Sequence, residues 1–162
     1  MSNVTSDNES TRRRRRLSTQ IKDSLRDLRN ELSMLNRQVG AQLQLKDVDM
    51  DCLDLINIYG PLSPSALARR AGLHPATMTG VLDRLEGAGW VARERDPSDR
   101  RAVAVRALRD RNGELYRLLF GMNSSMDEIC AGYDGAQLEL VADFLRRTTD
   151  AGRDATQQLA AG

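Results

Sequence analysis

The residues best suited to chemistry in this sequence are arginines, and they gather in two places. Five of them form the run from Arg12 to Arg16, and two more stand in the stretch DPSDRRAVAV, residues 96–105. Guanidinium groups bind phosphate oxygens and base edges, so both places are suited to an anionic partner. The alternative for each is a solvated surface, a charged tail in the first case and an exposed hairpin in the second.

The sequence lacks the residues that metal binding or catalysis would require. His74 is the only histidine, so a histidine-based metal site or a triad centred on histidine would have no second member. Cys52 and Cys130 are too few and too far apart for a disulfide scaffold or a zinc site. The sequence offers no nucleophile–base pair and no phosphate-binding loop. We therefore expect no enzyme activity, no cofactor and no metal.

The distribution of charge is more informative than its total. The net charge is only +1, but residues 1–16 and 61–109 are basic, whereas residues 17–60 and 110–162 are acidic. This pattern is typical of an anion-binding centre held by a neutral-to-acidic frame. No apolar run is long enough to cross a bilayer, and no apolar stretch follows the N-terminal charges, so we expect a cytoplasmic protein.

The two ends of the chain are expected to form the frame. Residues 1–16 have almost no apolar content and predict a disordered, arginine-rich arm. From residue 17 to about 43, apolar residues recur at spacings of four and three, which is a coiled-coil period on one long helix. An ordinary amphipathic helix on its own core is the alternative, but a seam this long and narrow favours packing along other helices, including those of another chain. The seam consists of Leu17, Ile21, Leu25, Leu28, Leu32, Leu35 and Val39.

The last third of the chain predicts two more helices, beginning near residues 110 and 134. Gln137 follows Asp134 by three residues and completes a capping box at the start of the second helix. Both helices carry apolar stripes that the small central part of the chain could not cover alone.

Three short helices and a hairpin are predicted between these ends. The first helix covers residues 47–59; the second begins after Ser63 and closes at Gly72; the third begins at His74 and runs to residue 86. Residues 90–95 and 102–107 have the composition of strands on either side of a Pro-Ser turn. Two short helices joined by a tight turn form a helix-turn-helix, and the hairpin follows it directly. The predicted core positions are Leu53, Leu55, Ile56 and Ile58 in the first helix, and Met78, Val81, Leu82 and Leu85 in the third.

The third short helix has the composition of a helix that reads DNA. Opposite its core face it carries Ala76, Thr77, Thr79, Gly80, Asp83 and Arg84. An ordinary exposed face would carry more glutamate and lysine. Hydroxyl groups bond phosphates or base edges, methyl groups contact the methyl group of thymine, and a helix N-terminus favours phosphate. Small residues are common on any surface, so this interpretation depends on the helix before it and the basic hairpin after it.

A resemblance to the MarR family of winged-helix transcriptional regulators is carried by LSPSALARRAGLHPATMTGVLDRLEGAGWVARERDPSDRRAVAV, above all by LDRLEGAGWV followed by DPSDRR. The resemblance implies a homodimer with intertwined terminal helices, a recognition helix in the major groove and a wing arginine in the minor groove. It matches Asp99 and Arg101 to the wing motif, and Asp83 to an acid that often pairs with the wing arginine. It also implies that small aromatic acids, phenols or thiol oxidation release the DNA.

Two departures from the family pattern stand out. Gly80 occupies a helix position that the family often fills with a base-reading arginine, and residues 107–110 replace the family's usual cap after the second wing strand. The first departure favours the alternative function, a winged-helix module for protein interaction with little DNA affinity. Redox sensing is a further alternative, but Cys52 lies among core residues, where thiols are inert, and Cys130 lies near a helix end.

We therefore predict a mostly α-helical protein with a small β-wing. The predicted parts are a disordered arm (1–16), a helical dimerisation region (17–46 and 110–162) and a winged helix-turn-helix DNA-binding region (47–109). The predicted function is that of a sequence-specific, ligand-responsive repressor that binds a pseudo-palindromic DNA operator as a homodimer. Asp83 and Asp99 are predicted to orient the wing, and no effector-binding residues are predicted. The predicted DNA contacts are Ser63, Ser65, His74, Ala76, Thr77, Thr79, Arg84, Arg95, Asp99, Arg100 and Arg101.

Overall fold

The structure is a computed structural model that describes residues 3–95 and 102–161. These residues form helices and one two-stranded antiparallel sheet, which confirms the predicted fold class. The chain divides into two units, Met1–Tyr116 and Arg117–Gly162. None of the helices formed by the described residues is both long and apolar enough to span a lipid bilayer.

The first helix, α1 (Asn3–Leu43), is longer than the sequence predicts. It ends where expected, but the prediction of disorder is wrong for residues 3–16, because the helix continues back to Asn3. Arginine is a good helix former, and a helix that is already nucleated is extended at little cost per residue. The run from Arg12 to Arg16 is exposed, so these side chains surround a helical rod instead of decorating a flexible tail.

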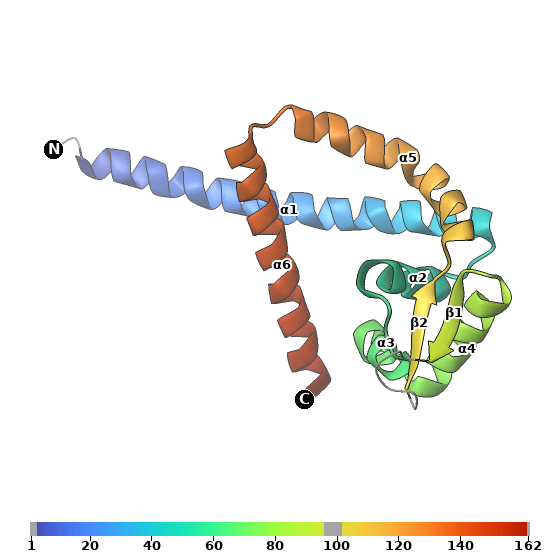
Figure 1. The fold of residues 1–162 in the computed structure, drawn as a ribbon. Helices are drawn as coiled ribbons and strands as arrows, with labels where there is room; N and C mark the ends of the chain where they lie inside the picture. The colour runs from blue at the N-terminus through green and yellow to red at the C-terminus, as the bar shows by residue number, and fades with distance from the viewer. Residues whose placement is uncertain (1–2, 96–101, 162) are drawn as a thin grey trace. The chain divides into compact units, whose positions relative to one another are not determined.

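Three helices follow, and the last two of them form the predicted helix-turn-helix (Figure 1). They are α2 (Asp47–Tyr59), α3 (Pro64–Ala71) and α4 (Pro75–Gly87), and each packs against the other two. Ser63 caps α3 as predicted, since its hydroxyl accepts a hydrogen bond from the N–H of Ala66 at 3.2 Å. Gly72 ends α3 in the left-handed conformation, with φ of 65°, which a glycine adopts without strain.

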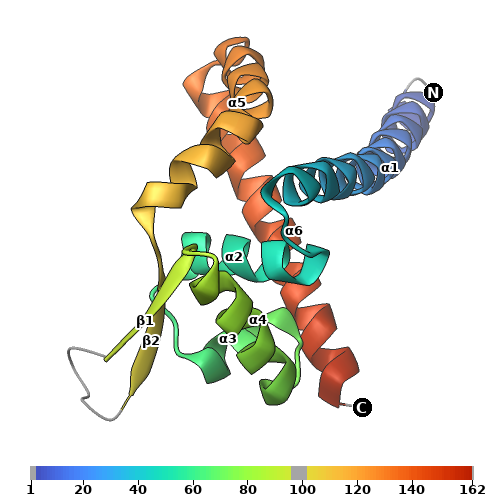
Figure 2. The ribbon, with the colours of Figure 1, turned by 90° about the vertical axis from the view of Figure 1, so that its right-hand side faces the viewer.

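The wing consists of β1 (Val91–Arg95) and β2 (Val103–Ala107), paired antiparallel (Figure 2). In the register of the pair, Arg93 lies opposite Val105. Leu62, before α3, exchanges two backbone hydrogen bonds with Val105, at 3.1 and 2.7 Å, so β2 is paired on both sides at its middle residue. The wing therefore leaves the body of the winged unit from a fixed base.

The core lies between the three short helices and the hairpin. The predicted inner face of α4 is confirmed, because all four of its apolar residues are buried. In α2, Leu53 and Ile56 are buried as predicted, but Ile58 is 69% exposed, so its assignment to the core is wrong. Ile58 lies two residues after Ile56, about 200° around the helix, so its side chain points away from the buried face of α2. The fully buried side chains are Trp90, Met50, Leu53, Ile56, Leu67, Met78, Leu82, Leu85, Val81, Val91, Val105 and Cys52.

Two long helices complete the chain, α5 (Arg109–Ala131) and α6 (Gly135–Ala161). The predicted capping box is confirmed: the N–H of Asp134 donates to Oε1 of Gln137, and the N–H of Gln137 donates to Oδ1 of Asp134, both at 2.9 Å. The apolar stripes of both helices remain largely exposed. On these stripes, Ile129 of α5 is 55% exposed and Leu145 of α6 is 44% exposed.

Candidate nucleic-acid interface

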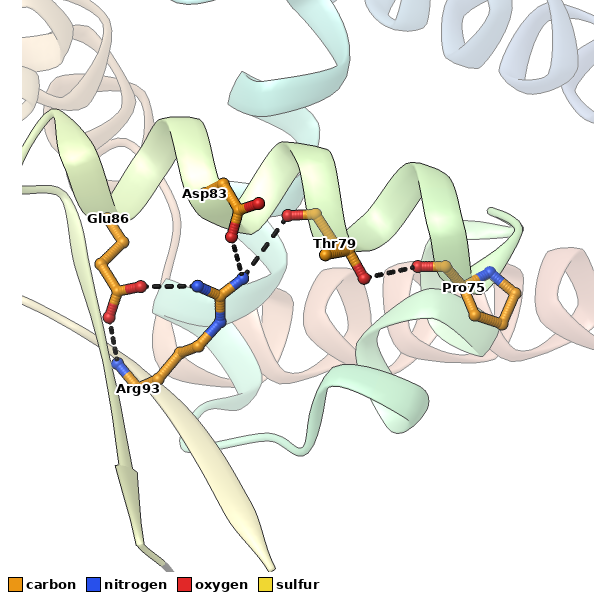
Figure 3. A network of polar contacts seen from close by, with 5 residues as sticks. All are labelled: Pro75, Thr79, Asp83, Glu86 and Arg93. Carbon is orange, nitrogen blue, oxygen red and sulfur yellow. Dashed lines mark hydrogen bonds and ion pairs between the residues drawn. The ribbon is translucent and has the colours of Figure 1, made fainter.

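The N-terminal half of α4 presents a small, uncharged surface. Ala76, Thr77 and Thr79 are exposed, as is His74, whose Nδ1 accepts a hydrogen bond from the N–H of Ala76 at 3.2 Å and so caps the helix. The hydroxyl of Thr79 donates to the carbonyl of Pro75 at 3.1 Å (Figure 3). The side chains of Ala76, Thr77 and Thr79 are short, so another molecule can approach the helix backbone closely here.

The serines predicted to contact DNA lie at the start of α3. Their hydroxyl oxygens are 3.2 Å apart, and Ser63 is partly engaged as the helix cap, whereas Ser65 is exposed. Arg69, one of two basic residues in the last turn of α3, is also exposed. Its neighbour Arg70 lies over the ring of Tyr59, 3.7 Å from the centroid.

The outer side of α4 is joined to the wing by Arg93. The guanidinium of Arg93 donates to Oδ1 of Asp83 at 2.7 Å, to Oε2 of Glu86 at 2.6 Å and more weakly to the carbonyl of Thr79 at 3.4 Å (Figure 3). The backbone N–H of Arg93 also donates to Oε1 of Glu86, at 3.1 Å. The hydrogen bonds to Asp83 and Glu86 raise the pKa of Arg93 above its ordinary value, so it stays charged.

This network fixes β1 against one face of the helix. The carboxylates of Asp83 and Glu86, one helical turn apart, bind the two terminal nitrogens of the Arg93 guanidinium. A lysine, with a single nitrogen, could not reproduce this geometry. Asp83, predicted to orient the wing, therefore contacts the base of the wing through Arg93.

Arg84 points the other way, toward α2. Its Nε and Nη2 donate to the two carboxylate oxygens of Asp49, at 3.0 and 2.5 Å. Asp49 is only 2% exposed, so Arg84 neutralises a buried charge and has fewer donors left for DNA than the sequence suggests. An added Cβ at Gly80, one turn earlier on α4, would lie 3.5 Å from Nη1 of Arg84, which is an ordinary contact distance, so the ion pair does not require a glycine there.

The remaining predicted contacts belong to the wing. Arg95 is exposed at the outer end of β1. Farther down the wing, Arg106 donates to Oε1 of Glu94 at 2.5 Å, and this hydrogen bond lowers the pKa of Glu94. Asp99, Arg100 and Arg101 lie outside the described residues.

Sequence reasoning missed two residues of this interface, and both had a signal. Asp49 precedes Cys52, Leu53 and Ile56 by three, four and seven residues, which places it on the buried face of α2. Arg93 alternates with Arg95 on one face of β1, and the helix before it carries two acids one turn apart. An acid on an apolar face and an arginine at the base of a strand both predict a buried or paired charge.

The two cysteines differ in environment. Cys52 is fully buried, and burial together with Asp51 and Asp49 raises the pKa of its thiol to about 11. Such a thiol is protonated at neutral pH and reacts slowly. Cys130, near the end of α5, is partly exposed.

Comparison with known proteins identifies the family of this chain. The sequence model of the MarR family matches residues 45–103, which include the helix-turn-helix and the first wing strand. Over 119 residues the chain is 34% identical to YcgE of Bacillus subtilis, an uncharacterized HTH-type transcriptional regulator, and the match covers 73% of this chain and 77% of YcgE. The chain belongs to the MarR family.

Other relatives agree with this assignment. The HTH-type transcriptional repressor YetL of Bacillus subtilis is 29% identical over 84 residues, 52% of this chain and 50% of YetL. The crystal structure of the transcriptional regulator Tm0710 from Thermotoga maritima shows the same fold, with a TM-score of 0.60 at 22% identity over 86% of this chain and 98% of Tm0710. As a MarR-family protein, the chain is a DNA-binding transcriptional regulator, and the proteins it matches are named as regulators, not as enzymes.

Proposed function

We propose that this MarR-family protein is a ligand-responsive repressor that binds a pseudo-palindromic operator as a homodimer, with α4 in the major groove and the wing in the minor groove. The observation that carries the proposal is the distribution of charge on α4. Asp83 and Glu86 are held by Arg93, and Arg84 by Asp49. The helix therefore presents its small, uncharged N-terminal surface to a partner, with no unpaired acid among its described side chains to repel phosphate.

This surface suits direct reading of base edges. Hydroxyl and methyl groups on Thr77 and Thr79 can bond a base edge or contact a thymine methyl group, and Ala76 lets the helix enter deeply. Ser65 and His74 stand beside the helix N-termini, where phosphates are favoured. Arg95 is exposed at the outer end of β1. We propose that Arg100 contacts a phosphate and that Arg101 enters the minor groove, with Asp99 orienting Arg101.

The exposed seam of α1 supports the homodimer. Leu17 and Leu28 are each 44% exposed, and Ile21 and Leu32 also remain exposed, although their spacing is that of a helix packed along its length. A single soluble chain rarely leaves such a continuous apolar surface in water. The exposed stripes of α5 and α6 add to it. A second copy of the chain would cover both.

Repression and ligand response have separate supports. YetL, which is similar to this chain, is named as a repressor, and this favours repression over activation. For an effector, the winged unit has a hollow of about 630 Å³ beside the first turns of α5. Asn57, Arg109 and Tyr116 are among its lining residues, and such groups suit a small aromatic acid or a phenol.

A DNA titration tests the proposal. Fluorescence anisotropy would measure binding to DNA from upstream of the protein's own gene, with a scrambled duplex as control, over a series of salt concentrations. We expect tighter binding to the upstream DNA, a steep salt dependence, and release by members of a panel of small aromatic acids and phenols. Equal, weak binding to both duplexes would instead favour the protein-interaction module.

Two wing substitutions sharpen the test. We expect Arg101→Ala to weaken binding by about 1–3 kcal/mol, more on an A·T-rich than on a G·C-rich minor groove. Arg100→Ala should weaken all sequences about equally, as the loss of a phosphate contact does. A uniform effect of both substitutions would contradict the minor-groove role of Arg101.

A further inference from the structure

The first turn of α5 is bound to the end of the recognition helix by one side chain, Arg111. Its Nη1 donates to the carbonyl of Ala88, the C-cap residue of α4, at 2.6 Å. Its guanidinium carbon also lies over the ring of Trp90, 4.2 Å from the centroid. One planar group thus contacts the residues on both sides of Gly89, where the chain turns from α4 into β1.

The surroundings hold this arrangement in place. Nε and Nη2 of Arg111 donate to the two carboxylate oxygens of Glu114, at 3.2 and 3.1 Å, and these bonds set the plane of the guanidinium. Trp90 is fully buried, its backbone N–H donates to the carbonyl of Leu85 on α4, and its carbonyl accepts from the N–H of Leu108, the residue before α5. Gly89 has a φ of 77°, and a Cβ there would lie 3.7 Å from Cδ of Arg111.

We infer that Arg111 is a positioning residue for DNA recognition, which keeps α4 and the first turn of α5 in one fixed relation. The inference rests on the proposed function, because only that function makes α4 the helix that recognises DNA. α4 is held at its side by Arg93 and at its C-terminal end by Arg111. A displacement of the first turn of α5 is therefore passed to α4 through this contact.

The chemistry of the contact requires arginine. A lysine could bond either the carbonyl of Ala88 or the face of Trp90, but its single nitrogen could not do both while also binding Glu114. Arg111→Lys therefore keeps the positive charge but cannot make the contacts with Ala88, Trp90 and Glu114 at the same time. Arg111→Ala removes both.

The test compares these variants with two controls in the full-length protein. Arg117→Ala removes an equal charge from an exposed position on α5, where the described residues offer it no partner. Leu115→Ala removes buried packing from α5 while leaving the contact with Ala88 intact. Measurements are made where circular dichroism shows every variant folded: DNA affinity by anisotropy, and the emission of Trp90, which is the only tryptophan.

We expect Arg111→Ala to lower the affinity for the upstream DNA about tenfold, and Arg111→Lys to restore less than half of that loss on a logarithmic scale. Arg117→Ala should stay within about twofold of the wild type. The emission of Trp90 should change in both Arg111 variants and in neither control.

Two results would overturn the inference. If Arg111→Ala bound DNA as tightly as the wild type but showed altered Trp90 emission, the contact would exist in the wild type without positioning α4 for DNA binding. A loss of affinity that Leu115→Ala reproduces at equal loss of thermal stability would reduce Arg111 to a stabilising residue. Failure of the wild type to prefer the upstream DNA is a different result, which would remove the proposed function and this inference together.

Discussion

Arg84 on the recognition helix and Asp49 on α2 form a two-point ion pair in which the carboxylate is buried and the guanidinium is half exposed. The hydrogen bonds to Asp49 raise the pKa of Arg84, so its guanidinium stays charged over the whole physiological range of pH. The arginine that looks most available for reading DNA in the sequence is thus the partner of the only buried acid among the described residues.

Arg84→Ala should therefore destabilise the fold more than it alters sequence preference. We expect a loss of about 3 kcal/mol in the free energy of unfolding, because Asp49 would be left buried without its partner. Urea denaturation measures this loss. The double variant Asp49→Leu with Arg84→Met should recover most of the stability, since it removes both charges from the site. A stable Arg84→Ala protein with altered operator preference would show that Arg84 reads bases.

Arg93→Gln should separate DNA binding from stability. The substitution frees β1 from Asp83 and Glu86 and leaves two unpaired carboxylates beside the DNA-facing helix. We expect about a tenfold loss of DNA affinity, and a loss of stability of only about 1 kcal/mol because the network is largely solvent-accessible.

Arg95→Gln is the matched control for Arg93→Gln. It makes the same chemical change two residues farther along β1, at an exposed position. We expect it to weaken binding to all sequences equally and to flatten the salt dependence, as the loss of a phosphate contact does. If Arg95→Gln and Arg93→Gln had the same effect, Arg93 would be one more cationic contact with no role in orienting the wing.

The elements of the winged unit were predictable because their signals are local. Ser63, Gly72 and the Pro75 start of α4 determine where helices begin and end through hydrogen bonds within a few residues, and each acts as expected. The partner of Arg84 was not predicted, because Asp49 is 35 residues away in sequence and only the packing of the folded chain brings the two together. The partners of Arg93 were not predicted either. Periodicity identifies the buried face of a helix, but it does not predict which charged side chains form ion pairs.

The α1 seam gives the prediction on assembly. Leu28→Asp together with Leu32→Asp should abolish the dimer and unfold much of the protein, because the proposed interface is also the only cover for this apolar surface. Light scattering and circular dichroism measure the two effects. Asn30→Asp places the same carboxylate between these positions, off the seam, and should leave the dimer intact. A folded monomer of the wild type at micromolar concentration would refute the proposed assembly.

The arginine run of α1 has a prediction that follows from its helical conformation. Successive residues of a helix are about 100° apart, so five of them surround the axis and only about three can face one duplex. Replacing Arg12 to Arg16 by glutamine should lower the salt slope of DNA binding by at most about 2.7, at roughly 0.9 per contact. An unchanged slope would identify the run as a solvated surface. Helix content should persist, since glutamine is also a good helix former.

Asp54 predicts a dependence of stability on pH. Burial and the neighbouring charge of Asp51 raise the pKa of Asp54, although Asn36 donates a hydrogen bond to it at 3.4 Å. A raised pKa means that the folded protein holds this proton more tightly than the unfolded chain does. The ionised carboxylate therefore costs stability at neutral pH, and this cost disappears as the pH falls through the folded pKa toward about 4, the value in an unfolded chain.

Asp54→Asn should accordingly raise the melting temperature at pH 7, and the difference from the wild type should shrink as the solution is acidified. Asp27→Asn makes the same change at an exposed position of α1 and is the control. Thermal denaturation at several pH values measures both. A melting temperature that falls in Asp54→Asn at pH 7 would mean that the hydrogen bond from Asn36 outweighs the cost of burial.

The tie between Arg93 and α4 also bears on base pairs that no side chain touches. In the proposed complex, one part of the protein enters the major groove and another enters the neighbouring minor groove, and the separation of these two insertions is set by the protein. In the duplex the same separation depends on local helical twist and groove width, which vary with sequence. Bases lying between the two insertions would then be selected for how easily they adopt the required twist, and an operator compared only at its contacted positions would look less specific than it is.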